Sequence, residues 1–327
     1  MQPRPLGATG LRVTPVGLGL AALGRPAYID LGRDADLGPA RDVEALERRC
    51  HQVLDAAFAA GVRYLDAARS YGRAEEFLAS WLRTRQLAPS EVTVGSKWGY
   101  SYVGDWRLDA TTHEVKDHSL PALTRQTAET RSLLGDHLDL YQIHSATLDS
   151  GVLEDPAVLD ELTRLRDRGL VIGLSTSGPA QPATIRRALE LTTAGRAPFG
   201  CLQATWNLLE PSAGPALAEA GSAGWGVIVK EAVANGRLTP HGHGPATTVL
   251  ARVAEGRGVG VDAVALAAVL ANPWADVVLS GAVTPAQLES NLAAPQLKLA
   301  PDELEELTTL AEPPDQYWRE RATLTWS

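Results

Sequence analysis

The sequence contains only two cysteines, no block of basic residues and no long apolar run. Cys50 and Cys201 lie in apolar-periodic segments, which favours buried thiols in a reducing compartment over a disulfide, and neither has the spacing of a zinc site. A net charge of −9 without a basic block argues against nucleic acid or an anionic membrane as a partner. A run of about 18 apolar residues, which a membrane-spanning helix needs, is missing, and residues 1–5 lack a signal-peptide layout. We therefore expect a soluble, cytoplasmic protein.

Apolar residues make up 45% of the 327 residues, which suffices for one barrel-type domain or two smaller ones. Short apolar runs, expected as strands, alternate with segments of helical periodicity such as 41–60 and 183–194. The expected strands are residues 16–20, 62–66, 92–97, 138–144, 170–175, 200–203, 226–230 and 275–281.

No break in composition divides the chain, so we predict a single (β/α)8 TIM barrel domain over residues 1–327. Residues 11–16 alternate apolar and polar after a Thr9-Gly10 turn signal, which predicts half of a short N-terminal hairpin. A doubly wound sheet is the alternative architecture, but the Gly-x-Gly-x-x-Gly turn typical of it is absent after the first strand.

Long connections after the first and third strands, 21–40 and 98–118, are expected to be functional. The second holds Trp98, Tyr100, Tyr102 and Trp106 in a chain that is only 6% aromatic. We expect residues 25–38, 98–118 and 316–327 to determine substrate choice, and their aromatic and charged residues suit an aromatic or polyhydroxylated carbonyl compound such as a sugar. The alternative is that the loop aromatics only cover the barrel rim.

Polar side chains end three consecutive strands: Asp66, Lys97 and His144. In a barrel all strand C-termini form one face, so these side chains should converge. Tyr71 follows Asp66 by five residues and can swing back over the barrel mouth. Each residue alone has a commoner structural explanation: a helix cap for Asp66, a solvated rim charge for Lys97, and packing for Tyr71 and His144.

Together these four residues form a plausible proton-transfer group. A phenol with a pKa of about 10 is a poor acid at neutral pH, and a nearby ammonium group lowers that pKa. Asp66 would keep Lys97 charged and oriented, while His144 would either hydrogen-bond the substrate oxygen or share the proton. Such a group protonates a carbonyl or deprotonates an alcohol; with no nucleophile and no metal cage, the hydride has to come from a cofactor.

The chain resembles the aldo-keto reductases, a family of nicotinamide-dependent (β/α)8 oxidoreductases. The matching pieces run in family order across nearly the whole chain: 66–72 (DAARSYG), 96–97 (SK), 139–144 (DLYQIH), 173–175 (GLS), 203–207 (QATWN) and 281–291 (GAVTPAQLESN). The resemblance implies that Tyr71 is the general acid/base, Lys97 the neighbour that lowers its pKa, Asp66 the partner of Lys97, and His144 the group that orients the carbonyl.

The resemblance also implies a nicotinamide site. Ser175 and Gln203 would bind the carboxamide, although the family's serine-asparagine pair is here Ser175-Thr176. Trp206 would stack on the nicotinamide ring where the family usually has tyrosine; simple barrel packing is the alternative.

Residues 230–238 correspond to the pyrophosphate loop of the family. Gly236 would let the backbone approach the phosphates, and Lys230 or Arg237 would neutralise their charge. The usual Ser-Pro-Leu is replaced by residues 231–233 (EAV), and Glu231 is a poor neighbour for phosphate.

The last strand and the helix after it correspond to the adenosine site, with Gly281, Gln287 and Asn291 at contacting positions. NADP(H) is the family default. Members that prefer it usually carry Arg or Lys just after the glycine, whereas this chain has Val283 and Thr284, so NAD(H) is not excluded.

We expect a reductase that interconverts an aldehyde, ketone or aldose and an alcohol. An aldose dehydrogenase working in the oxidative direction, a non-catalytic nicotinamide-binding regulatory protein, and a (β/α)8 hydrolase or lyase without a redox cofactor remain alternatives. The sequence does not indicate the physiological substrate, the direction of the reaction or the oligomeric state.

Overall fold

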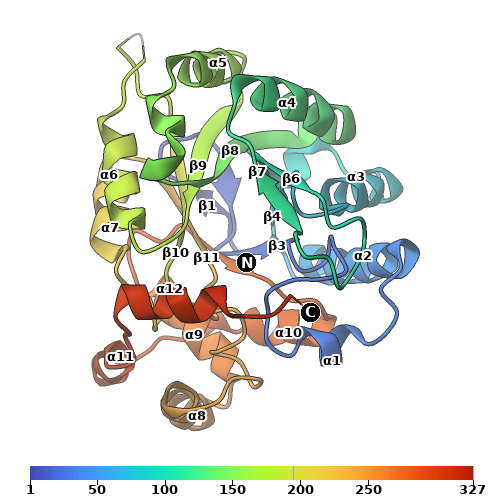
Figure 1. Cartoon of the computed structure of the whole chain (residues 1–327). Coiled ribbons are helices and arrows are strands. Elements are labelled where there is room, and N and C mark those ends of the chain that lie inside the picture. The colour runs from blue at the N-terminus through green and yellow to red at the C-terminus, as the bar shows by residue number, and fades with distance from the viewer. Residues whose placement is uncertain (194, 327) are drawn as a thin grey trace.

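The computed structural model describes residues 1–193 and 195–326 and contains a closed barrel of eight parallel strands (Figure 1). Each strand pairs with the next in the chain, and the last pairs with the first at Val278 and Val16. This confirms the predicted TIM barrel and excludes the doubly wound sheet. The strands are β3 (Val16–Gly19), β4 (Tyr64–Asp66), β5 (Thr93–Trp98), β8 (Leu138–Ala146), β9 (Val171–Thr176), β10 (Cys201–Thr205), β11 (Gly226–Lys230) and β12 (Val277–Ser280).

Helices surround the barrel, and side-chain caps begin several of them. The Ser119 hydroxyl accepts from the Ala122 amide, and Asp155 accepts from the amides of Ala157 and Val158. The helices are α1 (Arg33–Leu37), α2 (Val43–Ala59), α3 (Ala74–Arg85), α4 (Leu120–Leu134), α5 (Pro156–Asp167), α6 (Gln181–Glu190), α7 (Gly214–Ser222), α8 (Pro245–Arg257), α9 (Val261–Leu270), α10 (Pro285–Asn291), α11 (Pro301–Thr308) and α12 (Pro314–Ala322), with short 3-10 turns at Pro89–Glu91, Gly135–His137, Leu148–Ser150, Val152–Glu154 and Ala294–Gln296.

The C-terminal end predicted for α6 was wrong. We expected it over 183–194, but α6 ends at Glu190, because Leu191 has extended backbone angles and Thr193 pairs with Arg196 in an isolated bridge. Residue 194 lies outside the described residues.

A hairpin of β1 (Arg4–Pro5) and β2 (Arg12–Val13) closes the end of the barrel opposite the strand C-termini, which confirms the expected N-terminal hairpin. Leu6 and Val13 are fully buried in a cluster with Tyr64 and Cys201. Arg4 donates to the carbonyls of Asp276 and Ala275 at 2.8 and 2.9 Å. Both cysteines, Cys50 and Cys201, are buried and free, as expected.

The long connections at the other end carry structure that the sequence pattern missed. The first contains α1, and the second contains a hairpin of β6 (Tyr100–Tyr102) and β7 (Glu114–Lys116). The segment expected as a C-terminal tail forms α12, which lies in front of the barrel in Figure 1. The β6–β7 hairpin and α12 both contribute side chains to the space at the strand C-termini.

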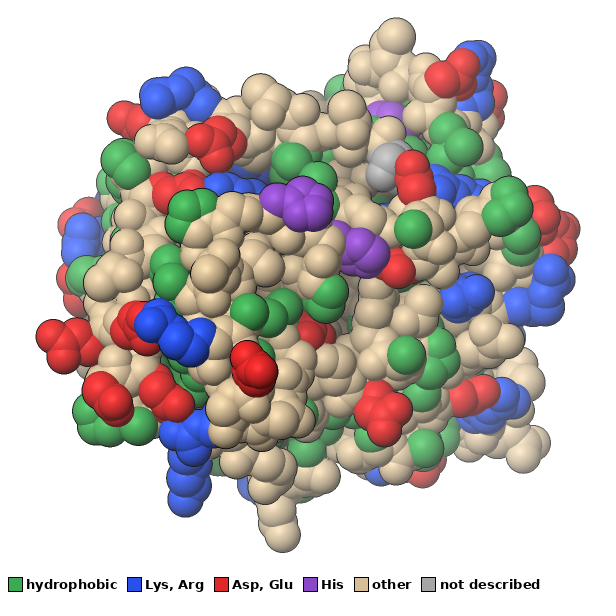
Figure 2. Space-filling view, turned by 90° about the horizontal axis from the view of Figure 1, so that it is seen from below, with side chains coloured by type: hydrophobic (Ala, Val, Ile, Leu, Met, Phe, Trp, Pro, Cys, Tyr) green, Lys and Arg blue, Asp and Glu red, His purple; other side chains and the backbone are tan. Residues whose placement is uncertain are grey.

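The surface carries charges of both signs. On the face seen in Figure 2, Lys and Arg side chains are interspersed with Asp and Glu side chains. Several form exposed ion pairs, such as Arg186 with Glu219 and Arg187 with Glu154. Within residues 1–193 and 195–326, each helix is too short or too polar to cross a membrane.

Candidate active site

A cavity of about 290 Å³ lies at the C-terminal ends of the strands. Its walls come from strand ends, from the two long connections and from the C-terminal segment. The lining residues used below are Arg25, Tyr28, Asp30, Asp66, Tyr71, Tyr100, Glu114, His144, Ser177, Gln203, Lys230, Glu231, Gly281, Arg321 and Trp326. The structure therefore brings Asp66, Tyr71 and His144 to one place, as the barrel geometry predicts.

Lys97 is fully buried between its two expected partners. Its Nζ forms an ion pair with Asp66 and lies 3.3 Å from Tyr71 Oη. It also donates to the Ala67 carbonyl at 3.0 Å. Burial lowers the pKa of Lys97, and Asp66 opposes that shift. Lys97 thus connects the carboxylate to the phenol.

Asp66 has more donors than the sequence suggested. Gln203 Nε2 donates to its Oδ1 at 2.9 Å, and Tyr64 Oη donates to the same oxygen at 3.2 Å. A buried carboxylate is stabilised by several donors, so Gln203 and Tyr64 hold Asp66 where it meets Lys97. Tyr64 was missed because its β4 position reads as ordinary barrel core.

His144 lies inside β8, two residues before its end, and its ring is T-shaped to that of Tyr71, with centroids 5.4 Å apart and ring planes at 84°. Ser70 Oγ lies 3.3 Å from His144 Nδ1. Burial lowers the pKa of His144 well below its usual value, and Lys97, Lys230 and Arg25 add to the effect. The imidazole is therefore neutral at neutral pH and has one N–H to donate.

The pKa of the Tyr71 phenol is shifted upward, whereas a downward shift was expected from the sequence. Burial raises its pKa well above the usual value, Asp66 raises it further, and Arg25 opposes the rise. Desolvation therefore dominates the pKa of this phenol, and the lowering effect of Lys97, whose Nζ lies 3.3 Å away, stays a prediction. Tyr71 is protonated at neutral pH, the form that can donate a proton.

The two residues expected to bind a carboxamide have different partners. Gln203 Oε1 is buried and lacks a hydrogen-bond partner among the residues described, so it can accept a donor from a ligand. Ser175 Oγ accepts from the Ser145 amide at 2.8 Å. Thr176 does not line the cavity and donates to Gln181, whereas Ser177 does line it.

Trp206 is not among the residues that line the cavity. Its indole packs edge-on against Trp274, with ring centroids 5.8 Å apart, and a Cβ on Gly214 of α7 would lie 3.2 Å from its Nε1. Trp206 thus packs within the barrel wall, and its stacking on a nicotinamide ring stays a prediction.

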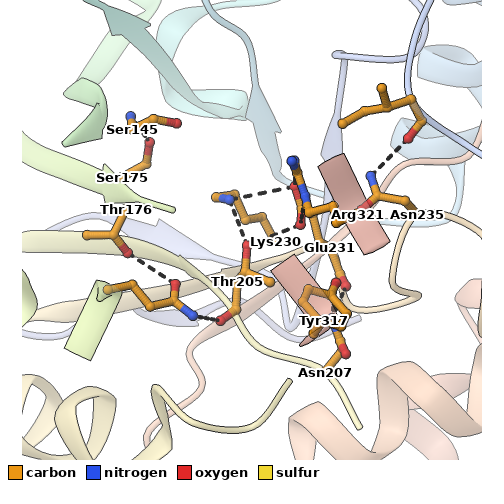
Figure 3. Close-up of polar contacts among 12 residues, drawn as sticks. Ser145, Ser175, Thr176, Thr205, Asn207, Lys230, Glu231, Asn235, Tyr317 and Arg321 are labelled. Atoms are coloured by element: carbon orange, nitrogen blue, oxygen red, sulfur yellow. Dashed lines mark hydrogen bonds and ion pairs between the residues drawn. The ribbon is translucent and has the colours of Figure 1, made fainter. Parts of the chain in front are cut away.

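Figure 3 shows a charged network at the end of β11. Lys230 donates to Thr205 Oγ1 at 2.7 Å, and its Nζ lies 3.8 Å from Glu231. Arg321 of α12 binds Glu231 through two nitrogens, with Nε 2.9 Å from Oε2. Burial opposes ionisation of Glu231, but Arg321 and Lys230 outweigh it and lower its pKa to about 2. Burial lowers the pKa of Lys230 to about 8.

This network changes the interpretation of residues 230–238. Arg321 compensates the charge of Glu231 from 90 residues away, which the sequence pattern could not show. Arg237 does not line the cavity; its guanidinium pairs with Glu312 and with Glu320 at 3.3 Å.

Gly236 has a φ of 89°, and a Cβ there would lie 2.8 Å from Asp30 Oδ1. The glycine therefore lets the loop after β3 approach closely. Asn235 fixes the same contact by donating to the Ile29 carbonyl at 2.9 Å (Figure 3).

The three residues expected at an adenosine site differ in availability. Gly281 lines the cavity, and a Cβ there would meet nothing within 4 Å. Gln287 accepts from the Val283 amide at 2.9 Å and donates to Asp36 at 2.6 Å. Asn291 is buried and joins Ser280 to Asp262, which is a structural role.

Known proteins share both the sequence pattern and the fold of this chain. The sequence model of the aldo/keto reductase family matches residues 15–312. A candidate aryl-alcohol dehydrogenase from Saccharomyces cerevisiae is 26% identical over 336 residues, covering 92% of this chain and 84% of that protein. An uncharacterized oxidoreductase from Bacillus subtilis is 28% identical over 165 residues, covering 50% of this chain and only 45% of that relative. The holo form of an aldo-keto reductase from Bacillus halodurans has the same fold, with a TM-score of 0.71, 21% identity and coverage of 95% of this chain and 97% of that one.

Proposed function

This chain belongs to the aldo/keto reductase family, and on that premise we propose that it interconverts a carbonyl compound and its alcohol with a nicotinamide cofactor and with Tyr71 as general acid/base. The observation that carries the proposal is the position of Tyr71. Its Oη lies 3.3 Å from Lys97 Nζ, and its ring meets His144, in a cavity at the barrel mouth.

The cavity residues fit such a cofactor. The unpartnered Gln203 Oε1 can accept a hydrogen bond from a carboxamide. The space next to Gly281 is open, since a Cβ at that residue would meet nothing within 4 Å. A nicotinamide cofactor, when bound, supplies or accepts the hydride. In the reductive direction the neutral His144 N–H binds the carbonyl oxygen, and Tyr71 Oη gives that oxygen its proton. Lys97 then stabilises the phenolate left behind.

For the substrate we favour an aromatic aldehyde. Tyr28, Tyr100 and Trp326 line the cavity near Tyr71, and the yeast relative is described as an aryl-alcohol dehydrogenase. An aldose is the second candidate, because Arg25 and Glu114 also line this part of the cavity and suit hydroxyl groups.

For the cofactor, the family default of NADP(H) has to be weighed against NAD(H). Val283 is buried, and Thr284 caps α10, with its side chain accepting from the Gln287 amide. Neither offers a charge to a 2′-phosphate, and the nearby Gln287 is bound to the Asp36 carboxylate.

The test is a panel of aryl aldehydes, aliphatic aldehydes and aldoses, each assayed with NADPH and with NADH by the absorbance of the reduced nicotinamide. We expect turnover of aryl aldehydes. Tight cofactor binding without turnover would indicate a regulatory protein, and no quenching of tryptophan fluorescence by either cofactor would indicate an enzyme without a redox cofactor. A hundredfold preference in kcat/KM for NADPH would exclude NAD(H) as the cofactor.

The raised pKa of Tyr71 predicts opposite pH dependences for the two directions. Reduction needs the protonated phenol, which is present throughout the neutral range, so its kcat/KM should stay level there. Oxidation needs the phenolate, so its kcat/KM should rise about tenfold per pH unit below the pKa of Tyr71. Profiles of kcat/KM in both directions test this. An oxidation rate that is level from neutral to alkaline pH contradicts it.

A further inference from the structure

Arg25 is a buried cation beside the proposed proton donor, and the family motifs assign it no role. It lies in the connection after β3 and is only 2% exposed. Its Nε donates to the Ala21 carbonyl and its Nη1 to the Ser70 carbonyl, each at 3.2 Å. Nη1 also forms an ion pair with Glu114 of β7. The Ser70 contact fixes the residue directly before Tyr71.

Aromatic rings surround the same guanidinium group. Arg25 Cζ lies 5.2 Å from the centroid of Tyr71, 4.9 Å from that of Tyr28 and 4.8 Å from that of Trp326. Trp326 is itself held by a parallel stack on His113 at 4.3 Å. A cation near aromatic faces is attracted by their π electrons, and the attraction grows when water is excluded. Arg25 therefore joins the C-terminal segment to the ring of Tyr71.

We propose that Arg25 is a positioning residue for proton transfer: its guanidinium holds the Tyr71 ring in place and stabilises the negative charge that the phenol oxygen gains when its proton leaves. In that step the O–H bond of Tyr71 breaks, its proton bonds to the carbonyl oxygen of the substrate, and the electron pair stays on the phenol. The inference rests on the proposed role of Tyr71 as acid/base.

Charged and titratable groups face Tyr71 from every side of the cavity. Lys97 of β5 and Arg25 favour the phenolate; Asp66 of β4, Glu114 of β7 and Glu231 after β11 oppose it; and His144 of β8 is neutral. Burial is the largest cause of the raised pKa of Tyr71; among the charges, Arg25 lowers that pKa and Glu114 raises it. Because Arg25 and Glu114 carry opposite charges, removal of Arg25 should raise the pKa of Tyr71, and removal of Glu114 should lower it.

The experiment measures kcat/KM for alcohol oxidation against pH in Arg25→Met, Arg25→Lys and Glu114→Gln. The rising limb is the part of the profile in which kcat/KM increases with pH. We expect Arg25→Met to shift this limb to higher pH by about one unit, which lowers kcat/KM for oxidation about tenfold at any fixed pH on the limb. Arg25→Lys keeps the charge and should stay near the parent limb, and Glu114→Gln should move the limb down. Arg73→Met is the matched control, because it removes a cation 5.9 Å from the Trp106 ring without touching Tyr71.

A purely structural role predicts that Arg25→Lys loses as much oxidation activity as Arg25→Met and that Glu114→Gln gains none, and either result would overturn the proposal. If Arg25→Met does not fold by circular dichroism, Glu114→Gln decides alone: an unmoved or raised limb overturns the proposal. A second readout needs no cofactor. The tyrosinate absorbance of the parent minus that of Tyr71→Phe gives the titration of Tyr71, and the same difference in the Arg25→Met background should lie at higher pH. Loss of the proposed function itself would instead appear as full activity in Tyr71→Phe.

Discussion

Replacing Tyr71 with Phe is expected to lower kcat for carbonyl reduction about a thousandfold, while cofactor affinity stays nearly unchanged. The substitution removes one hydroxyl group. It leaves the ring that packs against His144 at 5.4 Å and lies 5.2 Å from Arg25, so the cavity keeps its shape. Only the proton donor is lost. The measurement pairs steady-state kinetics with quenching of tryptophan fluorescence by the cofactor.

The matched control is Tyr141→Phe. Tyr141 is also a fully buried phenol, on β8, and is not among the residues that line the cavity. Its loss should leave kcat close to the parent value. If Tyr71→Phe and Tyr141→Phe behave alike, the acid/base role of Tyr71 is wrong.

Replacing Asp66 with Leu is expected to lower the free energy of unfolding by about 3–5 kcal/mol, because it leaves the fully buried Lys97 without a counter-charge. Gln203 and Tyr64 also lose their common acceptor. Urea unfolding at neutral pH measures the loss. The double variant Asp66→Leu with Lys97→Met should recover most of it, since no buried charge remains.

The pH dependence of Asp66→Leu gives a further check on the same variant. Burial lowers the pKa of Lys97 in the folded protein, and removal of Asp66 lowers it more. Between the folded and the unfolded pKa the unfolded chain binds more protons, so stability rises with pH. The variant should therefore regain stability relative to the parent as pH increases toward the pKa of free lysine. A penalty that does not change with pH would show that Lys97 keeps its proton in the folded variant through another partner.

The convergence of Asp66, Lys97 and His144 could be predicted because one rule governs it: parallel strands present their C-termini on one face. The positions of the strands could be predicted from short clusters of apolar residues. The structure places β11 at residues 226–230, as predicted. The positions of Trp206 and Asn291 were harder to predict. The orientation of Trp206, after β10, depends on its contact with Trp274, and that of Asn291, at the end of α10, depends on its hydrogen bond to Asp262. Both neighbours lie far along the chain.

Ion pairs between residues far apart in the sequence could not be predicted either. Glu231 pairs with Arg321 across 90 residues, and Arg25 pairs with Glu114 across 89. No local pattern links these partners. The pKa of Tyr71 could not be judged either, because it depends chiefly on burial, and burial follows from how the long connections and α12 fold over the cavity.

The closure of the barrel has a consequence for how the protein acquires its structure. β3 pairs with β12, and Arg4 reaches carbonyl groups 271 and 272 residues away. Contacts between such distant parts of a chain form slowly. On the ribosome, β3 can pair with β4 early, but its other edge stays unpaired until β12 has emerged. During synthesis, that open edge of the first strand is exposed to pairing with other chains.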